Sequence, residues 1–332
     1  MSSELHSSAI VIDGLVASKP GRTSFESMKR GGLTATNFTC SIWENFRDTM
    51  LNISEWHKMF AANNDIILQV KCVDDVRRAK ADGKVGIILG FQNISAIEDR
   101  IDAFSLFKEL GVGVMQLTYN GQNLAGTGCW ENYDGGLSNF GHDAIEEMNA
   151  HRILIDLSHV GPKTAGDAIG HSKQPVAFTH VAPLGLYKYG RNKSDEQLRA
   201  ISERGGFVGV STYTPFMAEH AAKATLDDIV SMIEYVINIC GEESVGIGTD
   251  MTQGRDEAFF DWVRADRGTG KRMVTSPYKT PPALPGFTSL SDYGNLTAAF
   301  EKRGWSEKRI LGVIGGNWLR FLGDVWAGAT AR

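Results

Sequence analysis

The sequence has few cysteines, no surplus of basic residues and no long apolar run, and each shortage excludes a class of protein. The four cysteines, Cys40, Cys72, Cys129 and Cys240, are far apart and form no Cys-x-x-Cys pair, which argues against a zinc ribbon or a dense disulfide framework. No stretch approaches the ~18 apolar residues of a membrane span. No basic segment followed by an apolar run marks a secretion signal. We therefore predict a cytoplasmic protein without a membrane partner.

The charge balance bears on the kind of partner. Acidic residues outnumber basic ones, and the formal net charge is -5. Because nucleic-acid binding needs a basic surface that neutralises phosphates, nucleic acid is not the expected partner. A small-molecule substrate is favoured instead, and a homodimer is compatible with the sequence. The 42% of hydrophobic residues is enough for a large core in one globular protein.

Short apolar, β-branched runs recur along the chain. Each ends in a polar residue and is followed by a segment with helical spacing. Runs that are apolar throughout and alternate with helices indicate a parallel sheet covered by helices. The eight runs span residues 9–13, 33–39, 85–91, 112–120, 153–159, 175–180, 206–212 and 244–250.

Eight such units favour a closed (β/α)8 barrel of the TIM type, formed by one domain over residues 1–332. A ninth apolar run, at 65–70, is predicted to be a short extra strand or part of a helix connection. The Gly- and Pro-rich stretch 251–287 is predicted to be a long loop, and the segment after it to form closing helices.

Function in such a barrel is expected at the carboxyl ends of the strands. His159 and His180 end neighbouring apolar runs, and neighbouring strands lie roughly 5 Å apart, so the two imidazoles could converge on one metal ion. Imidazole suits zinc. Asp250 ends the last run and could be a further ligand or a base. The strand-end polar residues are Asp13, Gln92, Asn93, Tyr119, Asn120, Asp156, His159, His180, Thr212, Tyr213 and Asp250.

A single histidine at a strand end is usually a hydrogen-bonded structural residue, so the pair matters more than either member. The remaining histidines that we considered are predicted to be surface or hydrogen-bonded residues; they are His57, His142, His151 and His171. Arg191 lies in the loop after His180 and could bind a carboxylate in bidentate fashion, although most loop arginines are solvated.

Several stretches resemble the membrane (renal) dipeptidase family, metal-dependent (β/α)8 barrels related to the amidohydrolases. The likeness runs along nearly the whole chain. The matching stretches are IDLSHVGPKTAGDAI, PVAFTHVAPLGLYKYGRNKSDEQLRAI, GGFVGV and VGIGTD, with weaker matches in GVGVMQLTYNGQNLAGTG, GGLSNFG and IGGNWLRFL.

The resemblance implies a hydrolase that cleaves an amide or peptide bond in a small carboxylate-bearing substrate such as a dipeptide. It implies that His159 and His180 bind one zinc ion, that Arg191 holds the substrate's carboxylate and that Asp250 is the general base and acid. We also expect Asn120 and Gln92 to contact the substrate.

The chain departs from the family pattern at the second metal. The family's first strand ends in Asp-x-His-x-Asp; here Asp13 matches, but Leu15 and Ala17 replace both ligands. Gln92 stands where a bridging glutamate is expected. Because leucine and alanine cannot bind a cation, we predict one zinc ion and no second metal site. The chain also resembles bacterial dipeptidase-like proteins that share its IDGL, GFQN and YN stretches, and this resemblance implies a bacterial subfamily with its own substrate. Asp13 is interpreted as an acceptor that orients a zinc-binding histidine or as a turn residue.

Tyr119 replaces a histidine that the family is thought to use for the oxyanion, and its phenol can act there as a neutral donor. Two other functions stay open beside the hydrolase. The barrel could bind a small carboxylate without cleaving it, or it could be a metal-independent lyase or isomerase that uses Asp250, His159 and Tyr119.

Overall fold

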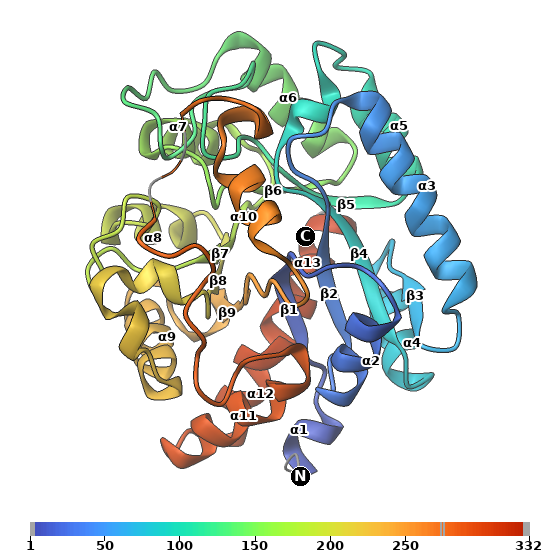
Figure 1. Cartoon of the computed structure of the whole chain (residues 1–332), viewed down its shortest axis with the longest axis vertical. Coiled ribbons are helices and arrows are strands. Elements are labelled where there is room, and N and C mark those ends of the chain that lie inside the picture. Colours follow the sequence, from blue (N-terminus) through green and yellow to red (C-terminus); the bar gives the residue numbers. More distant parts are fainter. Residues whose placement is uncertain (1–3, 273, 275, 328–332) are drawn as a thin grey trace.

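Eight parallel strands close into a barrel, as predicted (Figure 1). The computed structural model describes residues 4–272, 274 and 276–327. The extra strand β3 (Ile67–Gln69) pairs only with the start of β4, which confirms the first interpretation of the ninth run. In order around the barrel the strands are β2 (Ala35–Ser41), β1 (Ile12–Val16), β9 (Val245–Ile247), β8 (Phe207–Val210), β7 (Ala177–Val181), β6 (Leu154–Asp156), β5 (Val112–Gln116) and β4 (Val85–Phe91).

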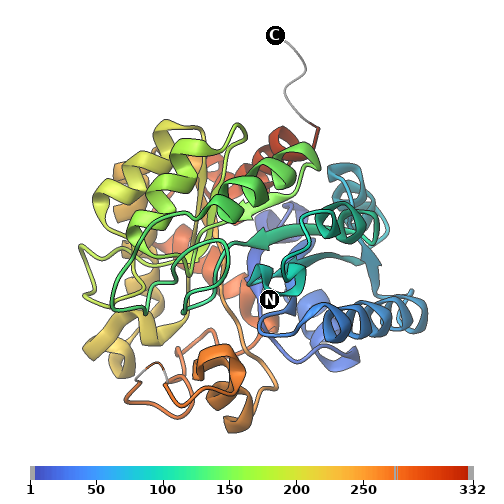
Figure 2. The ribbon, with the colours of Figure 1, turned by 90° about the horizontal axis from the view of Figure 1, so that it is seen from above.

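Helices surround the barrel (Figure 2). Ser194 caps α8 as its sequence suggests, because its hydroxyl accepts a hydrogen bond from the Gln197 amide. The helices are α1 (Glu4–Ser8), α2 (Arg22–Arg30), α3 (Phe46–Ala62), α4 (Val73–Ala81), α5 (Ala103–Glu109), α6 (Asn139–Ala150), α7 (Pro162–His171), α8 (Asp195–Glu203), α9 (Leu226–Cys240), α10 (Glu257–Arg264), α11 (Tyr293–Lys302), α12 (Glu307–Leu311) and α13 (Asn317–Ala327).

The prediction of an uninterrupted loop at 251–287 is wrong, because α10 lies within it. Asp256 caps this helix by accepting a hydrogen bond from the Phe259 amide, and Phe260 is buried beneath it. An aspartate followed by a short apolar stretch is thus enough to form two turns in a segment whose glycines and prolines favour a loop. Figure 1 shows α10 in front of the barrel.

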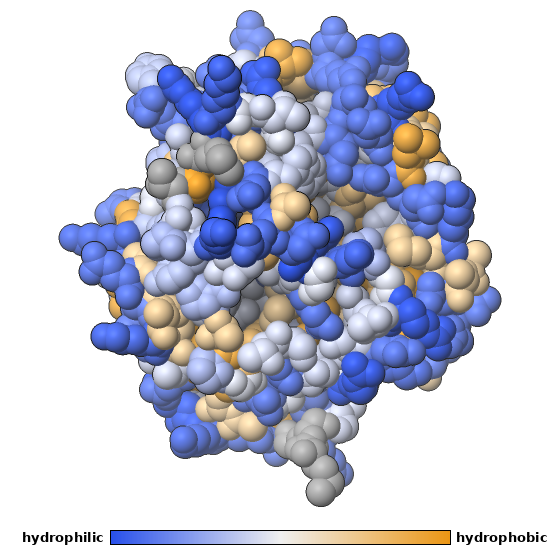
Figure 3. All heavy atoms as spheres, viewed as in Figure 1, coloured by the Kyte–Doolittle hydropathy of each residue, from blue (hydrophilic) through white to orange (hydrophobic). Residues whose placement is uncertain are grey.

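The face of the molecule in Figure 3 is mostly hydrophilic, and its apolar residues are scattered or in small groups. Within the described ranges, no helix has both the length and the apolar character that a bilayer span requires. The first three and last five residues of the predicted 1–332 domain lie outside those ranges.

The last helix closes the amino-terminal end of the barrel. Trp318 of α13 is 2% exposed, and its indole nitrogen donates to the Ile247 carbonyl at 2.8 Å. Glycines in the strands make room for the indole: a Cβ atom on Gly14 would lie 2.5 Å from its Cζ2 atom, and one on Gly246 would lie 2.8 Å from its Cδ1 atom. The carboxyl ends of the strands are left open on the opposite side, where a site can form.

We expect Trp318→Ala to lower the free energy of unfolding by about 3–5 kcal/mol, because it leaves a cavity among rigid strands and an unpaired carbonyl. Urea unfolding followed by circular dichroism measures this. Leu51→Ala is the control: this side chain is 58% exposed, and its loss should change stability by about 0.5 kcal/mol or less. Equal effects of the two variants would contradict the role given to Trp318.

Candidate active site

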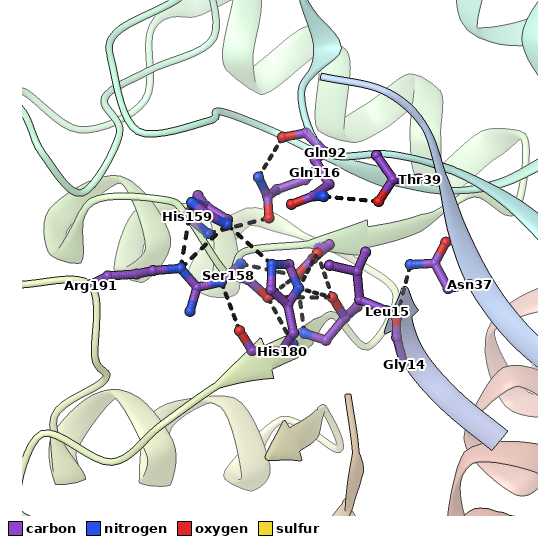
Figure 4. Close-up of polar contacts among 12 residues, drawn as sticks. Gly14, Leu15, Asn37, Thr39, Gln92, Gln116, Ser158, His159, His180 and Arg191 are labelled. Atoms are coloured by element: carbon purple, nitrogen blue, oxygen red, sulfur yellow. Dashed lines mark hydrogen bonds and ion pairs between the residues drawn. The ribbon is translucent and has the colours of Figure 1, made fainter. Parts of the chain in front are cut away.

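The open end of the barrel holds a cavity lined by side chains from the strand ends and from α10. Six of the eight predicted site residues line it: Gln92, Tyr119, Asn120, His159, Arg191 and Asp250. His180 contacts His159 (Figure 4). Asp13 lies within β1.

The two histidines face each other through their Nε2 atoms, which are 3.1 Å apart. The Nδ1 atom of His159 lies 2.8 Å from Asn120 Oδ1, an acceptor, so it carries the proton. The Nδ1 atom of His180 lies 2.7 Å from Thr179 Oγ1, whose own proton goes to Asp156. Both Nε2 atoms therefore direct lone pairs toward one point, the arrangement that binds a metal ion.

Both histidines are neutral in this arrangement. Burial lowers the pKa of His159 and of His180 well below the usual value, and the nearby Arg191 charge lowers both further. A neutral imidazole is the form that binds a metal.

Two aspartates fix the strands that carry His180 and Asp250, in the same way. Asp156 accepts hydrogen bonds from the Thr179 amide at 3.1 Å and from its hydroxyl at 2.6 Å. Asp13 accepts from the Thr249 amide at 2.8 Å and from its hydroxyl at 2.6 Å. Each threonine immediately precedes a site residue.

These bonds agree with the interpretation of Asp13 as a turn residue, since its partners are Thr249 and the Leu15 amide, at 3.1 Å. The carboxylate beside a histidine is that of Asp156, 3.7 Å from His180 Nδ1. Sequence reasoning missed the two threonines. The signal for them is a repeat: an Ile-Asp pair in each of two strands, and a threonine before the polar residue that ends each neighbouring strand.

Asp250 is held by its backbone and leaves its carboxylate free. It adopts a left-handed conformation with φ 57°, and its amide donates to the Leu15 carbonyl at 3.0 Å. Among the described residues its side chain has no hydrogen-bond partner. Burial raises the pKa of Asp250 to about 7, although the charge of Arg191 opposes the shift. A carboxylate of this kind can take and return a proton near neutral pH.

Arg191 is buried and reaches across the cavity. Its Nη2 atom donates to the His180 carbonyl at 2.8 Å, its Nε atom lies 3.3 Å from His159 Nε2, and its guanidinium stacks on Phe216 at 4.1 Å. Only Nη1 has no partner in the described part of the chain. The predicted bidentate binding of a carboxylate by Arg191 does not agree with this geometry, because two of the three guanidinium nitrogens already contact protein atoms.

Tyr119 stacks on His159, with ring centroids 4.1 Å apart, and Trp43 packs edge-on against its ring. Burial raises the pKa of Tyr119 well above its usual value, so its hydroxyl stays protonated and can donate a hydrogen bond. Gln116, which sequence reasoning also missed, accepts from the His159 amide at 3.3 Å and donates to the Gln92 carbonyl.

Comparison with known proteins identifies the fold and the family. Residues 12–262 match the family described as membrane dipeptidase, peptidase family M19. The chain belongs to the membrane dipeptidase family. It is 28% identical to an uncharacterized dipeptidase of Schizosaccharomyces pombe, over 90% of this chain and 71% of that one, and 28% identical to a dipeptidase of Aspergillus oryzae, over 92% and 70%.

A crystal structure of an amidohydrolase from Pseudomonas aeruginosa is 47% identical and has a TM-score of 0.95, over 98% of this chain and 99% of that one. A dipeptidase of family M19, described as a metallo peptidase, shares the fold at 20% identity and a TM-score of 0.80, over 96% and 99%. As a member of this family, the chain is a dipeptidase-like metallohydrolase.

The membrane dipeptidase pattern is incomplete in this member. Leu15 and Ala17, at the expected positions of the second metal's ligands, are buried and have no donor atoms. Gln92 offers a neutral amide. Among the described residues, no group of three or more His, Cys, Asp or Glu side chains could hold a metal. Two imidazoles, those of His159 and His180, are present as ligands for one ion, whereas Leu15 and Ala17 offer none for a second.

Protonation of Asp250 in the metal-free protein can be measured through stability. Its pKa rises from 3.8 to about 7 on folding, so between these values the folded state binds more protons than the unfolded state. Stability that depends on this group is therefore greatest below pH 4 and is lost as the pH rises through 7. We expect the free energy of unfolding of the wild type, minus that of Asp250→Asn, to fall by about 4 kcal/mol between pH 4 and pH 8.

The subtraction matters because His159 and His180, with lowered pKa values, contribute the opposite slope to both proteins. Denaturant unfolding at each pH, with chelator present, provides the values. A difference that stays flat or rises with pH would show that Asp250 is ionised in the folded protein.

Proposed function

We propose that the protein hydrolyses an amide bond in a small substrate with a carboxylate, using one zinc ion held by His159 and His180. The observation that carries this proposal is the pair of converging Nε2 lone pairs beside a free carboxylate and a free guanidinium nitrogen. When bound, zinc polarises the carbonyl group and makes a nucleophile of a water molecule. The predicted cytoplasmic location, single domain and homodimer stay predictions.

Asp250 is the proton carrier. Its carboxylate faces the cavity and its position is fixed by β1 through the Leu15 carbonyl. A carboxylate can accept a proton from water and pass it to the leaving nitrogen, and the burial of Asp250 favours its protonated form in that exchange.

Arg191 and Tyr119 position the substrate. The free Nη1 atom of Arg191 donates to the carboxylate, while the bond from Nη2 to the His180 carbonyl and the stacking on Phe216 hold the guanidinium in place. The Tyr119 hydroxyl, which has no hydrogen-bond partner within the described ranges, donates to the carbonyl oxygen as negative charge develops there. Asn120 keeps the His159 ring oriented through its 2.8 Å contact.

A second candidate is a protein that binds a small carboxylate without cleaving it. The lack of a third ligand among the described His, Cys, Asp and Glu side chains favours this alternative. A metal-independent lyase or isomerase would use Asp250 and Tyr119 in the same cavity. Metal content and turnover distinguish the three.

We expect zinc-loaded wild type to bind one equivalent of metal, measured by elemental analysis after gel filtration. His180→Ala should hold less than 0.1 equivalent. The control His142→Ala alters a histidine of helix α6 that is not among the lining residues of the cavity, so it should keep one equivalent. The triple variant Leu15→His, Ala17→Asp, Gln92→Glu should approach two equivalents. Wild type with less than 0.1 equivalent would contradict the proposed metal site, and two equivalents would contradict the loss of the second.

Steady-state kinetics on the best amide substrate found should distinguish the roles of Tyr119 and Arg191. Tyr119→Phe removes a donor that acts as charge develops, so kcat should fall about 100-fold with little change in KM. Arg191→Met should mainly raise KM, by tenfold or more, because it removes the contact to the carboxylate. The reverse pattern, with Tyr119→Phe acting on KM alone, would remove Tyr119 from the proposed mechanism.

A further inference from the structure

Two residues that line the cavity, Gln92 and Arg191, each have a buried polar atom without a partner among the described residues, and the two atoms have opposite hydrogen-bonding character. Gln92 is 2% exposed; its Nε2 atom donates to Thr39 Oγ1 at 2.9 Å, and its Oε1 atom accepts from no described residue. Arg191, also 2% exposed, has the unpartnered donor Nη1. Figure 4 shows Arg191 beside His159, and Gln92 with its hydrogen bond to Thr39. Because unpaired buried groups are costly, a ligand is expected to supply an N–H to Gln92 and an anionic oxygen to Arg191.

The charges around the cavity limit what else that ligand carries. Of the described residues that line it, Asp250 is the only one with a carboxylate, whereas Arg191 and Arg264 both carry guanidinium groups. Lys193 adds a buried ammonium group close by, with its Nζ atom 2.9 Å from the Val160 carbonyl. The charges of the described lining residues are therefore net positive.

A free dipeptide fits this lining poorly. It carries an ammonium group at the end opposite its carboxylate, and the only lining carboxylate available to that group is Asp250. An ammonium ion paired with Asp250 would lower the pKa of this aspartate and occupy the group that must exchange protons. Gln92 offers the neutral acceptor of an amide to an uncharged N–H, but no charge to balance an ammonium group.

We propose that the substrates are N-acyl amino acids, whose nitrogen is blocked and uncharged, in preference to dipeptides with a free amino group. The inference rests on the proposed hydrolase function. Water adds its oxygen to the acyl carbon as the carbon–nitrogen bond breaks. The acyl group leaves as a carboxylate, and the protons that water gives up convert the nitrogen to the ammonium group of the amino acid. Asp250 carries the transferred proton.

The decisive comparison uses two compounds that differ in one group. Propionyl-alanine and glycylalanine have the same length and the same amide and carboxylate, but the first ends in CH₃ where the second has NH₃⁺. With zinc-loaded wild type at pH 7, where the amino group of glycylalanine is mostly protonated, we expect kcat/KM for propionyl-alanine to be about tenfold higher or more, since placing like charges together costs more than a kcal/mol. Both enantiomers of alanine are tested. Equal rates, or faster cleavage of glycylalanine, would overturn the inference.

Variants at Gln92 test whether the neutral amide at this position causes the preference for propionyl-alanine. Gln92→Glu restores a negative charge, so it should shift the ratio of the two kcat/KM values at least about tenfold toward glycylalanine. Gln92→Met removes the acceptor without adding charge, so it should slow both reactions and leave their ratio unchanged. A ratio that Gln92→Glu leaves unaltered would assign the preference to another cause and contradict the argument.

Binding separates this inference from the hydrolase function. Titration calorimetry with the same two compounds on the same protein should give a lower Kd for propionyl-alanine. If that compound binds more tightly but neither is cleaved, the ligand preference stands and the hydrolysis of such amides is refuted. If neither binds below about 10 mM, or glycylalanine binds as tightly, the preference itself is wrong.

Discussion

The site depends on the hydrogen bonds that a threonine donates to a buried aspartate of the neighbouring strand. These hydrogen bonds join the two pairs of neighbouring barrel strands that share the fewest residue pairs. Strands β1 and β9 share one pair, Asp13 with Ile247, and strands β6 and β7 share one pair, Asp156 with Ala177. Burial raises the pKa of both carboxyl groups, yet several donors satisfy each of them. The same bonds that join the strands therefore place Asp250 and His180, the residues after the two threonines, at the cavity.

Strand β1 shows how a metal ligand can be lost without losing the fold around it. The carbonyl group of Leu15 still holds the Asp250 amide, and the Ala17 amide still donates to the Met251 carbonyl. These are backbone contacts, so they persist whatever side chains the two positions carry. Leucine and alanine at these two positions are therefore compatible with the observed placement of the proposed base, which depends on the backbone alone.

Much of the fold follows from the sequence because its strands are apolar on both faces and each precedes a helix. The polar residues that end the strands follow from the same pattern, and they do gather in one cavity. The helix α10 was not predictable from apolar periodicity, since it is short and depends on the Asp256 cap. The partners of Asp13 and the direction of Arg191 were not predictable either, because both depend on contacts between residues far apart in the chain.

The changes at the second metal site and the charge of the cavity have one physical origin. Carboxylates in a two-metal centre offset the charge of the ions, and a chain that gives up the second ion has no such charge to offset. Retaining those carboxylates would leave buried negative charges without partners, which is costly. Apolar residues at 15 and 17 and an amide at 92 avoid that cost. The guanidinium groups of Arg191 and Arg264 then outnumber the carboxylate of Asp250 among the described lining residues, so the proposed absence of a second metal and the proposed preference for an uncharged nitrogen have the same physical cause.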